Sequence, residues 1–143
     1  PDTPTEVLKL FGRMNQCIYN NNMSDKQFDE LVNQMRLLYS NSLLSQNPFE
    51  EQRDNLKDEI QEFRKQKRRI ANYTVDKGSS VKYKTIQNQD CAYVQMAYFM
   101  KENGNYTKSF QEYILVKENG KWKILSFQKN VSKDESKTEE QKG

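Results

Sequence analysis

Tyrosine hydroxyls are the groups in this chain best suited to act in a buried site, because histidine is absent. The sequence has eight tyrosines and no histidine. It therefore cannot build a histidine-based triad, a histidine general base or a histidine metal site. Six tyrosines could turn a hydroxyl into a cavity, although each is individually more typical of a core ring: Tyr19, Tyr39, Tyr73, Tyr83, Tyr98 and Tyr113.

Carboxylates give weaker evidence of catalysis. Asp54, Asp58 and Glu62 recur every four residues, away from the apolar stripe of their predicted helix, which is typical of a solvated face. A metal site needs inward-facing oxygens from several elements, so we predict no metal and no cofactor. Asp90 precedes a long predicted strand near a possible cavity rim, and it is the one candidate catalytic acid.

Residues 64–69 form a dense basic run, RKQKRR, with five positive charges. Such a run can bind phosphates or an anionic membrane surface. It also ends a predicted helix, where cations complement the helix dipole. Because the whole chain carries only +3, we favour the dipole and solubility role and predict no nucleic-acid partner.

Cys17 and Cys91 are the two cysteines. We interpret them as buried thiols, since free cysteine is among the most buried residue types. A disulfide outside the cytosol is the alternative.

Three helices are predicted in the first half of the chain. Thr3 is an N-cap followed by a proline at the first helical position, and Ser24 with Gln27 forms a capping box. A third helix opens at Asn47 with a thin apolar stripe. Leu43 and Leu44 fall in the link before it.

After residue 69 the apolar period changes from helical to alternating, which predicts five strands. Asn103-Gly104 and Asn119-Gly120 are strong hairpin signals. They join the last three strands into an antiparallel meander. The strand ranges are 70–75, 81–86, 91–101, 106–117 and 121–129. The fold class is therefore α+β, with N-terminal amphipathic helices packed on an antiparallel sheet of about five strands.

The two-residue turns determine which side chains share a sheet face. One face of the last three strands has no charged residue, and we expect it beneath the helices because an unpaired buried charge is costly. Its polar residues predict a pocket for a small apolar ligand; the alternative is that they bond to one another or lie in solvent. The candidate ligand-binding residues are Tyr98, Ser109, Gln111, Tyr113, Ser126 and Gln128.

The opposite, outer face carries large apolar groups that would form a sizeable exposed patch. We expect a homodimer or a partner protein to cover it; the alternatives are coverage by the chain's own segments or a mixed surface. The candidate interface residues are Phe99, Phe110, Ile114, Leu125 and Phe127.

A chain of 143 residues fits one domain, which we place at 1–131. Residues 132–143 contain no hydrophobic residue, and we expect a disordered charged tail. The chain begins with Pro1 rather than methionine, and we expect that an N-terminal segment, such as a signal peptide or a lipid anchor, has been removed. Any membrane attachment would then depend on that segment, because no apolar run is long enough to span a bilayer.

The hairpin at 113–124, YILVKENGKWKI, and the helices before the sheet resemble the nuclear transport factor 2-like superfamily with its cystatin-like cone. The resemblance is to small extracytoplasmic members of Gram-positive bacteria, many of them lipoproteins, so it implies a curved sheet and a secreted or membrane-anchored location. We hypothesise a non-enzymatic ligand-binding or protein-interaction module. The alternative is an isomerase or dehydratase that uses tyrosine and aspartate in the cone.

Overall fold

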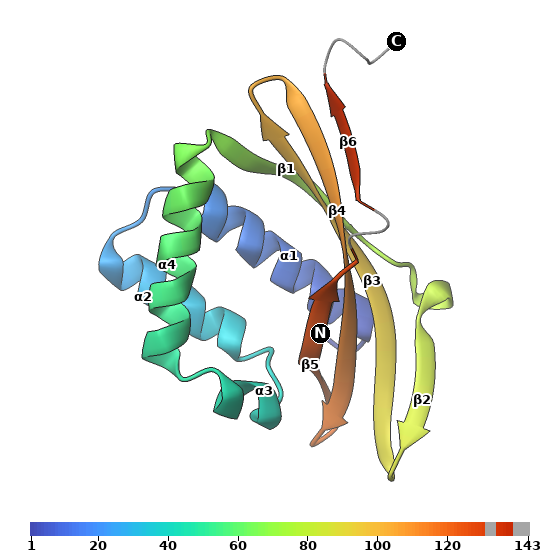
Figure 1. The fold of residues 1–143 in the computed structure, drawn as a ribbon. Helices are drawn as coiled ribbons and strands as arrows, with labels where there is room; N and C mark the ends of the chain where they lie inside the picture. Colours follow the sequence, from blue (N-terminus) through green and yellow to red (C-terminus); the bar gives the residue numbers. More distant parts are fainter. Residues whose placement is uncertain (131–133, 139–143) are drawn as a thin grey trace.

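Four helices precede an antiparallel sheet in the computed structural model, which describes residues 1–130 and 134–138 (Figure 1). The helices are α1 (Pro4–Asn20), α2 (Asp25–Arg36), α3 (Asn41–Gln46) and α4 (Phe49–Lys65). The strands are β1 (Arg68–Val75), β2 (Lys82–Ile86), β3 (Gln89–Glu102), β4 (Asn105–Glu118), β5 (Lys121–Lys129) and β6 (Glu135–Thr138), and a 3-10 turn, η1 (Gly78–Ser80), lies between β1 and β2. The predicted α+β class, with helices packed on a curved antiparallel sheet, is confirmed.

The helix starts follow the predicted caps. The Thr3 hydroxyl accepts a hydrogen bond from the Glu6 amide at 3.1 Å, and both halves of the Ser24–Gln27 capping box are present. The predicted link around Leu43 is instead the short helix α3. Its N-cap is the fully buried Ser40, whose hydroxyl accepts from the Leu43 amide at 3.1 Å.

The link between α2 and α3 is anchored to the sheet. The Ser40 amide donates to the Ile124 carbonyl at 2.8 Å, and the Ile124 amide donates to the Leu38 carbonyl at 2.7 Å. Tyr39 lies between these two bonds, so the bridge to β5 fixes the position of its ring.

The central strand pair keeps the predicted register. β3 and β4 pair from Cys91 opposite Val116 to Glu102 opposite Asn105. β1 and β2 both pair with β3, whereas β5 and β6 both pair with β4. The sheet is thus built around one long hairpin.

Two aspartates bind backbone amides of this hairpin where no neighbouring strand does. One lies between β1 and β2, beside β3, and the other lies between β5 and β6, beside β4. Asp76 Oδ2 accepts from the Gln95 amide at 2.9 Å, beyond the end of β1. Asp134 Oδ1 accepts from the Phe110 amide at 3.0 Å, where β5 has ended and β6 has not begun. Each carboxylate satisfies a backbone donor that the ladder leaves unpaired.

β6 departs from the prediction of a disordered tail over 132–143. Residues 135–138 form this strand and pair with residues 105–108 of β4. Asp134 is also described, whereas the tail positions 132, 133 and 139–143 lie outside the described residues.

A β-bulge in β5 corrects the predicted register of the last hairpin. Leu115 pairs with Ile124 as predicted, but Ile114 then pairs with Ser126, so Leu125 is an extra residue. A shift of one residue exchanges the two faces of a strand. Phe127 therefore lies on the helix-facing side, opposite Tyr113, rather than on the outer face.

α1 lies against the concave side of the sheet, and α2 and α4 lie beyond it (Figure 1). The close approach of α1 to the sheet requires a glycine at position 12. A Cβ on Gly12 would meet Met96 Cε at 2.5 Å and Tyr73 Cδ2 at 2.7 Å. Leu8, Leu115 and Ile124 are fully buried at this layer.

Arg64 in the basic run stabilises a different helix from its own. Its guanidinium donates to the Tyr19 carbonyl at 3.0 Å and to Asn22 Oδ1 at 2.6 Å. It also donates to the carbonyls of Ile18 and Asn21. α1 has no basic residue in its own last turn, so Arg64 complements the unpaired carbonyls there.

Both cysteines are free thiols. Cys91 is buried as predicted, but Cys17 is exposed near the end of α1, so the interpretation of two buried thiols is wrong for Cys17.

Candidate functional site: a cavity between the helices and the sheet

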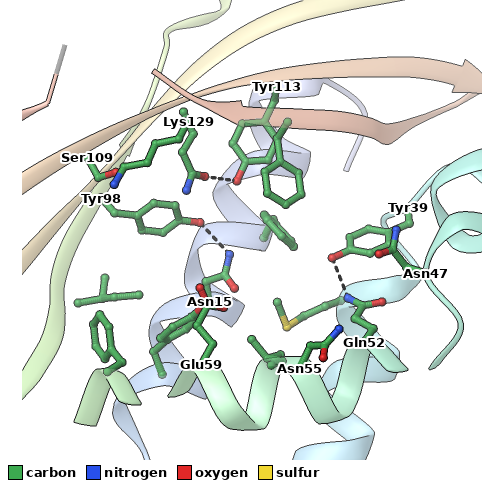
Figure 2. A pocket seen from close by; sticks show the side chains of 18 of the residues that line it. Asn15, Tyr39, Asn47, Gln52, Asn55, Glu59, Tyr98, Ser109, Tyr113 and Lys129 are labelled. Carbon is green, nitrogen blue, oxygen red and sulfur yellow. Dashed lines mark hydrogen bonds between the residues drawn. The ribbon is translucent and has the colours of Figure 1, made fainter. Parts of the chain in front are cut away.

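A cavity of about 930 Å³ lies between the helical layer and the concave face of the sheet (Figure 2). All four helices and the strands β1, β3, β4 and β5 contribute to its wall. The volume lies within the range typical of small-molecule sites.

Most of the predicted ligand-binding residues line this cavity. They are Tyr98, Ser109, Gln111, Tyr113 and Ser126. Gln128 does not line it, because the bulge at Leu125 pairs Gln128 with the exposed Glu112. The same shift brings Phe127, predicted for the outer patch, into the wall.

Amide side chains bind the tyrosine hydroxyls of the cavity (Figure 2). Asn15 Nδ2 donates to the Tyr98 hydroxyl at 2.8 Å. The Tyr113 hydroxyl donates to Gln111 Oε1 at 2.6 Å. The wall therefore has fixed neutral groups that donate and accept hydrogen bonds.

Burial keeps these hydroxyls protonated. It raises the pKa of Tyr98 and Tyr113 well above the ordinary tyrosine value, and the nearby Tyr98 hydroxyl raises that of Tyr113 further. Burial also raises the pKa of Tyr39, against a smaller opposing effect of its hydrogen bond with Gln52. At neutral pH the three tyrosines can orient a ligand by hydrogen bonds, but none is available as a tyrosinate base.

Aromatic rings form one wall of the cavity. Phe127 stacks on Tyr113 with ring centroids 5.1 Å apart and an interplanar angle of 25°. Phe11 meets Tyr113 edge-on at 6.0 Å and contacts Tyr39 at 6.1 Å. Phe127 is 47% exposed, so this apolar wall reaches from the core to the cavity mouth.

The cavity also contains charged residues that sequence reasoning missed. They are Glu59, Arg68 and Lys129. Glu59 accepts a hydrogen bond from the Tyr19 hydroxyl at 2.7 Å. The signal for Glu59 was its spacing, three residues after Leu56 and four before Phe63 on the apolar stripe of α4. The sequence carried no comparable signal for Lys129, because its orientation depends on the bulge.

Asp90, the candidate catalytic acid, is not among the cavity-lining residues. It is exposed at the start of β3 and accepts a hydrogen bond from the Thr85 hydroxyl at 3.2 Å. Asp54, Asp58 and Glu62 are exposed along α4. Within the described part of the chain, no three carboxylate or cysteine side chains form a possible metal site.

The outer face of the sheet carries a smaller apolar patch than predicted. Phe99, Phe110 and Ile114 are half-buried there, and Leu125 is the half-buried bulge residue. The Lys108 amine lies over the rings of Phe99 and Phe110, at 4.9 and 4.8 Å from their centroids. Phe127 does not belong to this patch.

The fold and the cavity define an α+β domain with a helix-covered pocket on a curved sheet. The chain belongs to a family described as "Domain of unknown function (DUF6715)", whose model matches residues 1–127. None of the curated proteins matches the sequence. Among the described residues, no helix is long and apolar enough to cross a membrane.

Proposed function

We propose that this domain is a non-enzymatic module that binds a small, partly apolar molecule in the cavity between the helices and the sheet. We also propose that it is an extracytoplasmic member of the nuclear transport factor 2-like superfamily. The order of helices before a curved antiparallel sheet supports that membership.

Ser109 carries the binding proposal. It is only 4% exposed, it lines the cavity, and its hydroxyl has no hydrogen-bond partner among the described residues. The hydroxyl oxygen is not among the fully buried polar atoms without a partner, so it is open to the cavity, where a ligand or an ordered water can bind it. The aromatic wall beside it supplies apolar surface for the rest of a ligand.

The placement of the carboxylates favours binding over the isomerase or dehydratase alternative. Asp90 lies outside the cavity. Glu59 is the one carboxylate that lines the cavity among the described residues, and it already accepts the Tyr19 hydroxyl proton in a hydrogen bond. The tyrosines supply hydrogen bonds rather than a base.

A tryptophan that fills the cavity tests the proposal. Leu56 is half-buried and lines the cavity, so Leu56→Trp should occupy the space of a ligand. We expect it to weaken binding of the neutral dye Nile red at least about tenfold in a fluorescence titration, because the apolar contacts are displaced. Leu37→Trp is the matched control, since Leu37 is 63% exposed and does not line the cavity.

Circular dichroism of both variants checks that the fold is intact. The proposal fails if the unaltered protein does not bind the dye, or if a folded Leu56→Trp variant binds it as tightly as the Leu37→Trp control.

A further inference from the structure

Resting on the proposed binding function, we propose that the ligand carries an anionic oxygen head group, a carboxylate or a phosphate, bound by Lys129, Ser109 and Gln111. The apolar part of the ligand would then lie along Phe127 and Tyr113. The ligand class is an amphipathic anion.

Strand register brings the three donors together. Ser109 and Gln111 are two residues apart on β4 and therefore point to the same face. Lys129 pairs directly with Gln111 across β4 and β5, and Tyr98 pairs directly with Ser109 across β3 and β4. Figure 2 shows the Lys129 and Ser109 side chains at the same end of the cavity, above Tyr98.

Each of the three residues presents a donor. The carbonyl oxygen of Gln111 accepts from the Tyr113 hydroxyl, so its amide nitrogen is left to donate. The Ser109 hydroxyl has no partner among the described residues. With the Lys129 ammonium, they form a set of donors that suits an anionic oxygen better than a neutral or cationic group.

Lys129 keeps donor capacity despite an acidic neighbour. Its amine lies 3.5 Å from Asp134 Oδ2, which is longer than a good charged hydrogen bond. The other oxygen of Asp134 accepts from the Phe110 amide, which fixes the carboxylate on β4. The side chain of Lys129 is 57% exposed, so its amine can turn toward a ligand.

The charges in the cavity wall also favour an anion. Arg68 and Lys129 are positive, whereas Glu59 is the one negative residue among the described residues that line it. The Arg68 guanidinium lies 5.0 Å from the centroid of the Phe63 ring and forms no ion pair within the described part of the chain.

The aromatic wall continues directly from the donor set. Phe127 is two residues before Lys129 on β5, and Tyr113 is two residues after Gln111 on β4. A head group at Lys129 therefore places the next part of the ligand against the stacked rings of Phe127 and Tyr113.

Calorimetric titration with four octyl compounds at neutral pH tests the head group. Octanoate and octyl phosphate carry the two anionic heads, octan-1-ol is neutral, and octylammonium is cationic on the same tail. We expect at least one anion to bind about tenfold or more tightly than octan-1-ol, and octylammonium to bind more weakly still. The preferred anion distinguishes a carboxylate ligand from a phosphate ligand.

Three variants tie this preference to the donor set. Lys129→Gln should reduce anion binding to the level of octan-1-ol, whereas Lys121→Gln, which removes an equal charge from an exposed position of the same strand, should not. Asp134→Asn should tighten anion binding several-fold, because it removes the competing charge and keeps the oxygen that accepts from Phe110.

The head-group proposal is overturned if octan-1-ol and both anions bind equally, or if Lys129→Gln and Lys121→Gln have the same effect. It is also overturned if no octyl compound binds while Nile red does, and the binding function then stands. If neither the octyl compounds nor the dye binds, both proposals fail.

Discussion

At the scale of single residues, Tyr98 and Tyr113 combine a buried ring with a hydrogen-bonded hydroxyl at the cavity. They are 6% and 1% exposed. Two properties of tyrosine make this possible: the ring contributes apolar area to the core, and the hydroxyl needs a single polar partner. Asn15 and Gln111 provide those partners.

From the raised pKa values of these two tyrosines, we predict that the free energy of unfolding falls at alkaline pH. Their folded pKa values are raised, so the unfolded chain releases these protons first, near its ordinary tyrosine pKa of about 10. Below about pH 10 both tyrosines are protonated in the folded and the unfolded chain, so their contribution to the free energy of unfolding does not change with pH. Above about pH 10, each such tyrosine should lower the free energy of unfolding by up to about 1.4 kcal/mol per pH unit.

Urea unfolding across this pH range measures the slope. Tyr98→Phe removes one of the ionising groups and should make the slope shallower. An unchanged slope in that variant would show that Tyr98 ionises as readily in the folded protein as in the unfolded chain.

At the scale of elements, the bulge at Leu125 and the glycine in α1 decide where the cavity lies. The bulge turns Phe127 and Lys129 toward the helices. Gly12 lets α1 approach Met96 and Tyr73 without a side chain between them. The distance between α1 and the sheet therefore depends on one missing methyl group.

Gly12→Ala should destabilise the fold, by about 1–3 kcal/mol, because the new Cβ would lie 2.5 Å from Met96 Cε and 2.7 Å from Tyr73 Cδ2. Urea denaturation gives the free energy of unfolding. Gly78→Ala is the control, since a Cβ there has nothing within 4 Å, and we expect a change of less than about 0.5 kcal/mol. Equal effects at the two positions would contradict the close packing of α1.

At the scale of the whole molecule, the sheet separates two surfaces with different expected roles. The concave side contains the cavity, and the outer side carries the half-buried patch of Phe99, Phe110 and Ile114. A homodimer through the outer patch remains a prediction, and the corrected position of Phe127 makes it separable from ligand binding.

Two charge substitutions should separate these roles. If a second copy covers the outer face, Phe110→Glu should give a monomer in size-exclusion chromatography with light scattering and leave Nile red binding intact. Phe127→Glu should weaken dye binding and leave the oligomeric state unchanged, because Phe127 lines the cavity. A monomeric unaltered protein at high concentration would contradict the dimer.

Local signals in the sequence determined the types of the longer helices and strands and part of the register, but not α3 or β6. Thr3, Ser24 and Gln27 cap helices through contacts within one turn. The turn at Asn103-Gly104 sets the pairing of β3 with β4 from Glu102 opposite Asn105 to Cys91 opposite Val116. Four of the six predicted ligand-binding residues line the cavity for this reason: Tyr98, Ser109, Gln111 and Tyr113. Ser126 also lines the cavity, but it lies on β5, after the bulge.

Tertiary structure alone decided the rest, because it depends on contacts between residues far apart in the chain. The α3 helix forms where Ser40 is anchored to Ile124 in β5. Arg64 binds the end of α1, more than forty residues earlier. The bulge at Leu125 exchanges the faces of Phe127, Gln128 and Lys129, since a strand alternates with a period of two and one extra residue shifts the pairing by one. The sequence therefore predicted a cavity with polar groups, whereas only the folded chain placed Lys129 and Phe127 inside it.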